Sequence, residues 1–338
     1  MESTNDKVTI VAEIGVNHDG DLGKAKDLVL AAKDCGADFV KIQSFSPELL
    51  ALPSTPKVAY QKQRDQSTSH FEMLSRLTLT SEQQEALKSF CDDSNVGFFS
   101  TPYDPSQVSF LASLGVPFMK VASADIIDLD LLHAISESGI PAIISTGMAT
   151  QEEILHAVGI LDLGGSPLTV LHAVSMYPTP PEHLRLQSIP HLQQLLGKPI
   201  GFSDHSESYD AAPIAVALGA TMVEKHFTLN NSDPGPDHAA SVNPEIFAAM
   251  VSAIRQAESM MTSHPEQLTE TEHDMRAVSR KSWVTAIPLQ RGTRISRNHL
   301  AARRPGNGIP VNQVELVLGK MVVRDLPAFH LLRADDLE

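Results

Sequence analysis

Two histidines each lie near the end of a short hydrophobic run that is typical of a β-strand. The runs are PIGFSDHS (199–206), with His205, and TMVEKHFT (221–228), with His226. A stretch with helical composition separates them, so we expect two consecutive parallel strands. Their carboxyl ends then meet at one edge of a sheet, where α/β enzymes carry their chemistry. The pair therefore predicts a divalent metal site.

The donor types limit which metal would bind. Imidazoles with carboxylates nearby, here Asp204, Asp237 and Glu13, suit Mn²⁺, Mg²⁺, Co²⁺ or Zn²⁺. Only two protein ligands are firmly indicated, which leaves positions open for water and substrate and favours catalysis over a structural role. The alternative is that each histidine is an ordinary neutral, hydrogen-bonded residue.

Two lysines, Lys41 and Lys120, stand in equivalent places near the ends of two other runs that must be buried. An unpaired buried lysine is costly, and one shared anion, a phosphate or a carboxylate, would satisfy both. Taken singly, each lysine is more typical of a surface or barrel-bottom position. The pair predicts an anion site.

Hydroxyl side chains follow several of the same runs. Any one of Thr101, Ser123, Ser145 and Ser203 is expected to be a helix N-cap when considered alone. Beside two lysines, the set of four predicts a phosphate cradle. Other polar residues at strand ends are Glu13, Gln43, Asp125, Ser175 and Tyr177.

The elements that must position these residues alternate regularly. Eight strand-like runs are separated by helical patterns, at 8–15, 37–45, 96–103, 117–123, 141–148, 168–174, 199–206 and 221–228. This order predicts a (β/α)₈ TIM barrel, and a doubly wound sheet is the alternative. We expect a catalytic barrel domain over 1–265, a linker over 266–281 and a small β-rich domain over 282–338.

The expected small domain contains an internal sequence repeat. Leu289, Ile295 and Leu300 align with Leu326, Leu332 and Leu337 at a constant offset. The segment RRPGNGIP (303–310) between the halves is too rich in glycine and proline for a strand or helix, and is expected to be a loop.

Composition excludes several classes of function. The chain has 338 residues, a net charge of −15 and two cysteines. This charge argues against nucleic acid and anionic membrane as partners. The polar amino terminus and the absence of a long apolar run predict a cytoplasmic protein. An anionic small substrate would need a local cationic pocket, which the two lysines could supply.

In order along the chain, ten motifs resemble those of the sialic acid synthase family. They are AEIGVNHDG, VKIQ, FFSTPYD, KVASAD, ISTGM, YPTP, GFSDH, EKHFT, GPDHAAS and RRPGNG. The last module resembles the antifreeze-like (SAF) domain of bacterial members. The resemblance implies condensation of phosphoenolpyruvate with an N-acylated hexosamine to give a nine-carbon α-keto acid and phosphate, with Mn²⁺ or Mg²⁺ as cofactor.

The resemblance also implies residue roles. The metal ligands fall on His205 and His226, and Glu13 is placed for acid–base work. The phosphoenolpyruvate contacts fall on Lys41, Thr101, Lys120, Ser123, Ser145, Ser175 and Ser203. The sugar contacts fall on Gln43, Tyr177 and Asp237, and Arg304 reaches the N-acyl group from the neighbouring protomer of a domain-swapped homodimer. The expected catalytic residues are Glu13, Lys41, Lys120 and Asp125. Asp125 stands where glutamate is common in the family, and Ser175 where some members have asparagine.

The residues leave alternatives open. A pyruvate-dependent metal aldolase on the same barrel would not need a phosphate cradle. A metal-dependent hydrolase would want a denser cluster of histidine and aspartate. A non-catalytic carbohydrate-binding protein would leave the polar strand ends unexplained. The sugar is N-acetylmannosamine, giving N-acetylneuraminate, or a 2,4-diacetamido-2,4,6-trideoxymannose, giving N,N'-diacetyllegionaminate; the insertion 58–74 resembles members of the second kind at least as much.

Overall fold

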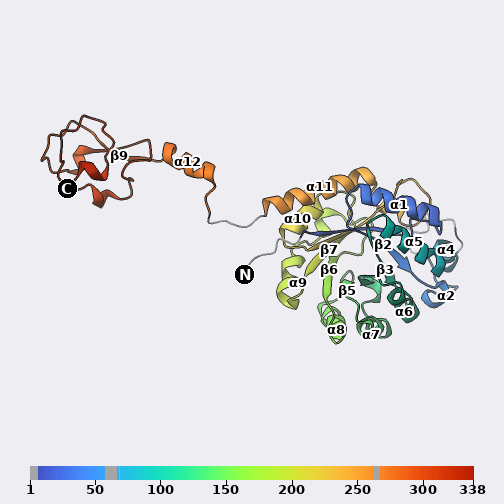
Figure 1. Cartoon of the computed structure of the whole chain (residues 1–338). Coiled ribbons are helices and arrows are strands. Elements are labelled where there is room, and N and C mark those ends of the chain that lie inside the picture. The colour runs from blue at the N-terminus through green and yellow to red at the C-terminus, as the bar shows by residue number, and fades with distance from the viewer. Residues whose placement is uncertain (1–6, 58–66, 68, 262–266) are drawn as a thin grey trace. The chain divides into compact units, whose positions relative to one another are not determined.

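The computed structural model describes residues 7–57, 67, 69–261 and 267–338. The chain divides into two compact units, Met1–Thr262 and Ser263–Glu338. Each unit is described by itself, beginning with the larger one (Figure 1).

The larger unit is built on a closed barrel of eight parallel strands. The strands are β1 (Thr9–Gly15), β2 (Phe39–Ser44), β3 (Gly97–Pro102), β4 (Met119–Val121), β5 (Ala142–Ser145), β6 (Leu168–Ala173), β7 (Ile200–Asp204) and β8 (Met222–His226). β1 pairs with β2 on one side and with β8 on the other, which closes the sheet. The predicted (β/α)₈ barrel is confirmed, and a doubly wound sheet is excluded because that sheet would have two free edges.

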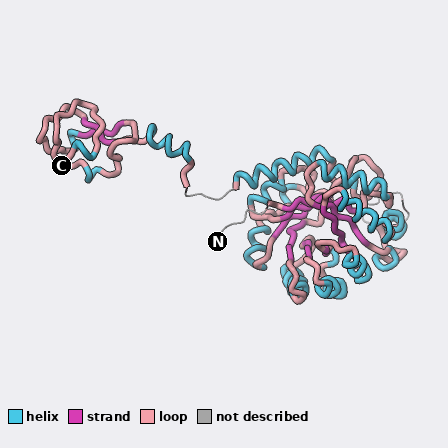
Figure 2. The backbone as a smooth tube through the Cα atoms, in the orientation of Figure 1, coloured by secondary structure: helices cyan, strands magenta, loops and turns pink. Residues whose placement is uncertain are grey.

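Helices form a ring outside the strands, as Figure 2 shows. They are α1 (Leu22–Asp34), α5 (Ser81–Asp93), α6 (Pro105–Ser113), α7 (Leu129–Ser138), α8 (Gln151–Asp162), α9 (Ser188–Leu196), α10 (Ala211–Ala217) and α11 (Pro244–Met260). Two short helices, α2 (Pro47–Leu50) and α4 (His70–Leu77), belong to the insertion after β2. Among the described residues, no helix is long and apolar enough to span a bilayer.

α1 illustrates why these segments are helical. Asp21 caps its amino terminus by accepting a hydrogen bond from the Lys24 amide. Its buried residues recur with helical periodicity and face the barrel: Ala25, Leu28, Val29 and Ala32. The same combination of a polar cap and one apolar stripe recurs in most of the outer helices.

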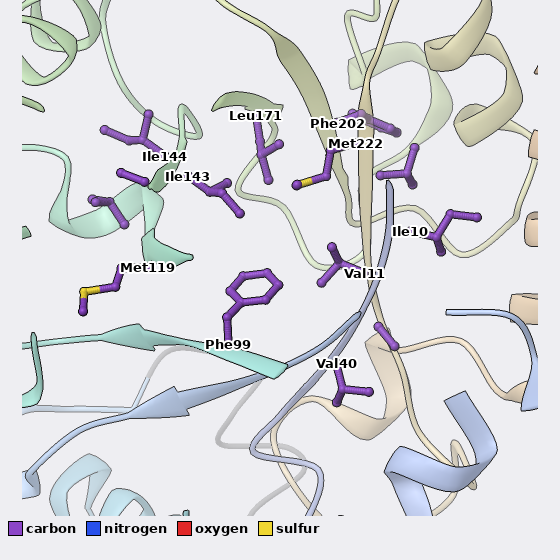
Figure 3. Close-up of a cluster of buried hydrophobic side chains, with 14 of the residues drawn as sticks. Ile10, Val11, Val40, Phe99, Met119, Ile143, Ile144, Leu171, Phe202 and Met222 are labelled. Atoms are coloured by element: carbon purple, nitrogen blue, oxygen red, sulfur yellow. The ribbon is translucent and has the colours of Figure 1, made fainter. Parts of the chain in front are cut away.

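The barrel interior is apolar below its carboxyl-terminal end. Figure 3 shows the side chains that converge inside the ring of strands, namely Val11, Phe99, Ile143, Leu171 and Met222. Successive residues of a strand point to opposite faces. The inward positions two residues later on these strands are Glu13, Thr101, Ser145, Ala173 and Glu224. A largely polar layer therefore lies above the apolar side chains.

The smaller unit contains α12 (Glu270–Ser279) and a two-stranded antiparallel sheet, β9 (Ser282–Thr285) and β10 (Leu300–Arg303). α12 occupies most of the predicted linker. The repeated apolar residues join one core, with Leu289, Ile295, Leu300, Leu326 and Leu332 buried and Leu337 packed against them. Leu289 and Leu326 form a β-bridge, so the two copies of the internal repeat contact each other directly.

Candidate active site

A cavity of about 610 Å³ opens at the carboxyl ends of the barrel strands. Nearly all of the predicted site residues line it: Glu13, Lys41, Gln43, Thr101, Lys120, Ser123, Ser145, Ser175, Tyr177, Ser203, His205, His226 and Asp237. They come from all eight strands or the loops that follow them. Residues that are far apart in sequence therefore meet at the carboxyl ends of the strands.

Lys41 and Glu13 form a buried ion pair at one side of the cavity floor. The two residues are register partners on β1 and β2, so the pairing follows from the barrel itself. Lys41 also donates to Thr101 Oγ1 at 3.1 Å, and Gln43 Nε2 donates to Glu13 Oε1 at 3.1 Å. Burial raises the pKa of Glu13 although Lys41 opposes the shift, so this carboxyl group can hold a proton more readily than an exposed one.

Lys120 occupies the other side of the floor. Its ammonium donates to Ser145 Oγ at 2.6 Å and lies 3.9 Å from Glu224 Oε1. Burial lowers the pKa of Lys120 to about 8, even though Glu224 opposes the shift. Burial alone would raise the pKa of Glu224, but Lys120 and Lys41 outweigh it and lower the value to about 2. Glu224 is therefore an anion shared by both lysines.

Next to Lys120, backbone and hydroxyl groups form a small cradle. The Gly147 amide donates to Ser123 Oγ at 3.0 Å. A Cβ atom at Gly147 would collide with Ser175 Oγ and would lie 2.9 Å from Ser123 Oγ. A larger residue at this position would displace the two hydroxyls. The cradle and the lysines together offer cationic and hydrogen-bonding groups to an anion.

The two histidines face each other across the opposite side of the cavity. Their ring centroids are 5.5 Å apart, and the Tyr177 ring lies 4.3 Å from that of His205. His205 Nδ1 donates to the Val174 carbonyl at 2.7 Å. Asp237 Oδ2 lies 3.9 Å from His226 Nδ1. Two imidazoles, a phenol and a carboxylate thus define a second polar end.

These histidines have the properties of metal ligands. Burial, and next the neighbouring His226, lower the pKa of His205 to about 3; burial also lowers the pKa of His226. Both rings are therefore neutral at pH 7. The Val174 carbonyl fixes the tautomer of His205 and leaves Nε2 as its acceptor nitrogen, with Ser203 Oγ 3.5 Å away. Outer hydrogen bonds orient metal-bound histidines in the same way. Within the described residues, His226 Nδ1 is buried without a hydrogen-bond partner.

The donor set fits a divalent cation with open positions. In the described part of the chain, no group of three or more His, Cys, Asp or Glu side chains is close enough to hold a metal by itself. A metal on His205 and His226 would take its other ligands from water and substrate. That incomplete set matches a catalytic site better than a structural one.

One wall of the cavity is apolar and comes largely from the insertion after β2. Its lining residues are Val16, Leu50, Ala51, Met73, Leu74 and Leu77. Most of them also belong to a separate hydrophobic cluster with Phe45 and Tyr103. Residues 58–66 and 68 of this insertion lie outside the described residues. Of the segment 58–74, whose resemblance was predicted, the structure describes only residues 67 and 69–74.

Comparisons with known proteins identify the family of this chain. The model of the NeuB family matches residues 28–266, and that of the SAF domain matches residues 280–338. The chain belongs to the NeuB family. It is 36% identical to the N,N'-diacetyllegionaminic acid synthase of Legionella pneumophila, over 97% of this chain and 94% of the relative.

Solved structures of similar proteins cover both units. The N-acetylneuraminic acid synthetase of Leptospira borgpetersenii, in complex with citrate, superposes with a TM-score of 0.73 at 31% identity, over 80% of this chain and 90% of that one. The spore coat polysaccharide biosynthesis protein SpsE of Bacillus subtilis gives 0.65 at 33%, over 98% and 95%. The curated relatives include several synthases, which supports an enzyme.

Two predicted residues do not belong to the cavity lining, one in the NeuB-family barrel and one in the smaller unit. Asp125 ends a 3-10 turn (Ser123–Asp125) and is partly buried; burial raises its pKa to about 6. Arg304 is exposed on the smaller unit. Their predicted roles remain predictions.

Asp204 corrects one expectation about the metal site. It points away from the histidines and forms a fully buried ion pair with Lys225, at 2.8 Å between Oδ2 and Nζ. Lys225 Nζ also donates to the Ser206 and Ser208 carbonyls at 2.6 and 2.9 Å. The pair braces the loop that follows His205. Strand alternation explains this, because Ser203 and His205 point inward and Asp204 points outward.

Three residues in or beside the cavity were not singled out by the sequence motifs as site residues: Glu224, Gly147 and Tyr103. Glu224 and Gly147 stood within strand-end runs, and the inward register of β8 could have identified Glu224 as a partner for the lysines. Tyr103 ends the strand-like run 96–103 and was likewise not assigned a role. Its ring packs edge-on against Phe45, with centroids 6.0 Å apart, and this contact between two loops is not visible in the local sequence.

Proposed function

We propose that this protein is a nonulosonic acid synthase that condenses phosphoenolpyruvate with an N-acetylated hexosamine and releases phosphate. One observation carries the proposal: two buried lysines and a hydroxyl cradle face two neutral histidines within a single cavity. The first end suits a small molecule with two anionic groups. The second suits a carbonyl compound that binds beside a metal.

In this proposal, Lys41 and Lys120 hold the two anionic groups of phosphoenolpyruvate. Hydrogen bonds to the phosphate and carboxylate would come from Thr101, Ser123, Ser145, Ser175 and Ser203, and the Gly147 amide would hold Ser123 in place. Both lysines already lie within 4 Å of Glu224, at 3.8 and 3.9 Å. Preorganised cations in a buried site cost no reorganisation when the ligand reacts.

The sugar would bind at the other end, between Gln43, Tyr177 and Asp237. Mn²⁺ or Mg²⁺ held by His205 and His226 would supply Lewis acidity at the C1 aldehyde of the open-chain sugar. The protein's part is to keep both imidazoles neutral and to orient the aldehyde toward phosphoenolpyruvate. Such positioning converts a bimolecular step into an effectively unimolecular one.

The chemistry requires a movable proton between the two ends. The enol carbon C3 of phosphoenolpyruvate attacks the aldehyde, water adds at C2, and the C2–O bond breaks to release phosphate and leave the α-keto acid. Glu13 lies between Lys41 and Gln43, and its raised pKa lets it take the proton from water or give one to the sugar oxygen. Asp125 would assist this proton transfer, because its charge acts on both Lys120 and Tyr103.

The apolar wall favours one of the two sugars. A 2,4-diacetamido-2,4,6-trideoxymannose carries a C6 methyl and a C4 acetamido methyl where N-acetylmannosamine carries hydroxyls. Methyl groups against Leu50, Met73 and Leu74 remove apolar surface from water, whereas hydroxyls there would lose hydrogen bonds. We therefore propose the trideoxy sugar as substrate and N,N'-diacetyllegionaminate as product.

We further propose a cytoplasmic, domain-swapped homodimer in which Arg304 acts in trans. The arginine is exposed on a unit distinct from the barrel. A guanidinium is suited to a sugar's N-acyl oxygen because it offers several donors in a fixed plane.

The test measures phosphate release from phosphoenolpyruvate with each sugar, with Mn²⁺ or with EDTA. Release should require a sugar, cease on chelation, return with Mn²⁺, and show the higher kcat/KM with the trideoxy sugar. Full activity in EDTA would contradict the metal role. A pyruvate-dependent aldolase would use pyruvate and release no phosphate, and a carbohydrate-binding protein would turn over neither.

A further inference from the structure

Asn17 lies behind the active site, in the loop after β1, and does not line the cavity. It is fully buried. Its side-chain nitrogen donates to the Phe227 carbonyl at 2.9 Å and to Ser241 Oγ at 2.8 Å. A carbonyl can only accept, so the atom that faces it is the amide nitrogen. Asn17 thus connects two segments that are far away in the sequence.

The first connection holds the strand end that bears His226. Phe227 directly follows His226, and its amide donates to the Glu13 carbonyl at 2.8 Å. The His226 carbonyl in turn accepts from the Val242 amide at 2.9 Å. With Asn17 on the Phe227 carbonyl, the backbone on both sides of the His226–Phe227 peptide is fixed.

The second connection holds the loop that bears Asp237. Ser241 Oγ accepts from Asn17 and donates to the Asp237 carbonyl at 2.7 Å. Ser241 is itself buried, so water does not compete for these bonds. One amide therefore reaches the backbone of His226 and, through one hydroxyl, the backbone of Asp237.

A second group of contacts joins the loop after β1 to the loop after β8. His238 Nδ1 lies 2.6 Å from Thr228 Oγ1, and its Nε2 lies 3.4 Å from Asp19 Oδ2. Lys24 bridges Asp19 and Asp233 at 2.7 and 2.8 Å. This network braces the loop around Asp237 independently, so loss of the Asn17 contacts should shift the loop without unfolding it.

We propose that Asn17 is a positioning residue that sets the separation of His226 and Asp237. It thereby controls the sugar and metal end of the cavity and leaves the phosphoenolpyruvate end unaffected. Neither Asn17 nor Ser241 has a hydrogen bond to Lys41, Lys120 or Ser145 among the described contacts. The inference rests on the proposed function for the identity of the two ends.

The experiment compares Asn17→Asp with Ser241→Ala. Asn17→Asp keeps the shape but removes both donors and faces two acceptors with an oxygen. It should raise the sugar KM at least tenfold and weaken Mn²⁺ binding severalfold, measured by electron paramagnetic resonance without substrate. The KM for phosphoenolpyruvate should stay within twofold. Ser241→Ala removes only the second connection, so it should raise the sugar KM and leave Mn²⁺ affinity unchanged.

Gln193→Glu provides the matched control. It makes the same amide-to-carboxylate change at an exposed site where the nitrogen also donates to a backbone carbonyl, that of Gly219 at 2.7 Å. It should leave both KM values and Mn²⁺ affinity unchanged.

Two results would overturn the proposal: folded Asn17→Asp with a normal sugar KM and normal Mn²⁺ affinity, or an equal rise in both KM values. If Asn17→Asp does not fold, Ser241→Ala decides by the same split between the two KM values. If wild-type protein releases no phosphate, the proposed function fails, and Mn²⁺ affinity alone then decides whether Asn17 positions His226.

Discussion

The Lys120 ammonium lies 3.9 Å from the Glu224 carboxylate inside the barrel, and burial lowers the pKa of Lys120 to about 8. A lysine with this pKa is still mostly charged at neutral pH but loses its proton just above it. Because Lys41 is held in the charged form by Glu13 and Glu224, the cationic end of the cavity contains two lysines that differ in their response to pH.

The first prediction concerns alkaline pH. As pH rises through 8, Lys120 in the free enzyme becomes neutral, so kcat/KM for phosphoenolpyruvate should fall about tenfold per pH unit above that value. In Lys120→Arg the guanidinium stays charged, and the profile should remain level to about pH 10, at a lower overall rate. A wild-type profile that is level from pH 7 to 10 would show that Lys120 does not contribute its charge.

The second prediction concerns the cradle. Gly147→Ala should raise the KM for phosphoenolpyruvate at least tenfold, because the new methyl group collides with Ser175 Oγ and crowds Ser123. The sugar KM should change little. Gly159→Ala is the control, since a Cβ there meets nothing within 4 Å and the residue lies in α8. Equal kinetics for Gly147→Ala and wild type would remove this glycine from the anion site.

The third prediction concerns stability. Burial, and next Asp128, raise the pKa of Asp125 to about 6 from the ordinary 3.8, so its charged form destabilises the folded state. The stability that this group contributes is complete below pH 3.8 and is lost as pH rises through 6. Asp125→Asn should therefore raise the free energy of unfolding at pH 7.5 by up to about 3 kcal/mol, and should change it little at pH 4. Urea unfolding at the two pH values measures this, and destabilisation at pH 7.5 would contradict it.

The fourth prediction concerns the smaller unit. Arg304→Ala should raise the sugar KM much more than that of phosphoenolpyruvate, because only the sugar carries the N-acyl group. Mixing Arg304→Ala with the inactive Lys41→Met variant should restore part of the activity if the arginine serves the partner's cavity. Arg303→Ala is a neighbouring control, since Arg303 stacks on Phe329, 4.6 Å from the ring centroid. An active monomer would refute the trans arrangement.

The sequence was enough to predict the barrel and most of the cavity. Each strand places polar residues beyond an apolar run, and the parallel topology then brings Lys41, Lys120, His205 and His226 to one end. The same period of two could have shown that Asp204 faces outward. The inward register of Glu224 is predictable in the same way. Its contact with both lysines is not, because that contact depends on the closure of the barrel.

Other features depend on contacts that no local pattern encodes. The apolar wall arises because the insertion after β2 folds back over the cavity, with Met73 and Leu74 packed in one cluster with Phe45. The connection from Asn17 to Asp237 joins loops at opposite ends of the barrel sequence.

The most direct test of the central claim follows the bridging oxygen of phosphoenolpyruvate. The enzyme is incubated with Mn²⁺, the 2,4-diacetamido-2,4,6-trideoxymannose and phosphoenolpyruvate labelled with ¹⁸O between C2 and phosphorus, and the phosphate is examined by mass spectrometry. We expect sugar-dependent phosphate that retains the label, because the C2–O bond breaks. Unlabelled phosphate, or phosphate released equally without sugar, would contradict it.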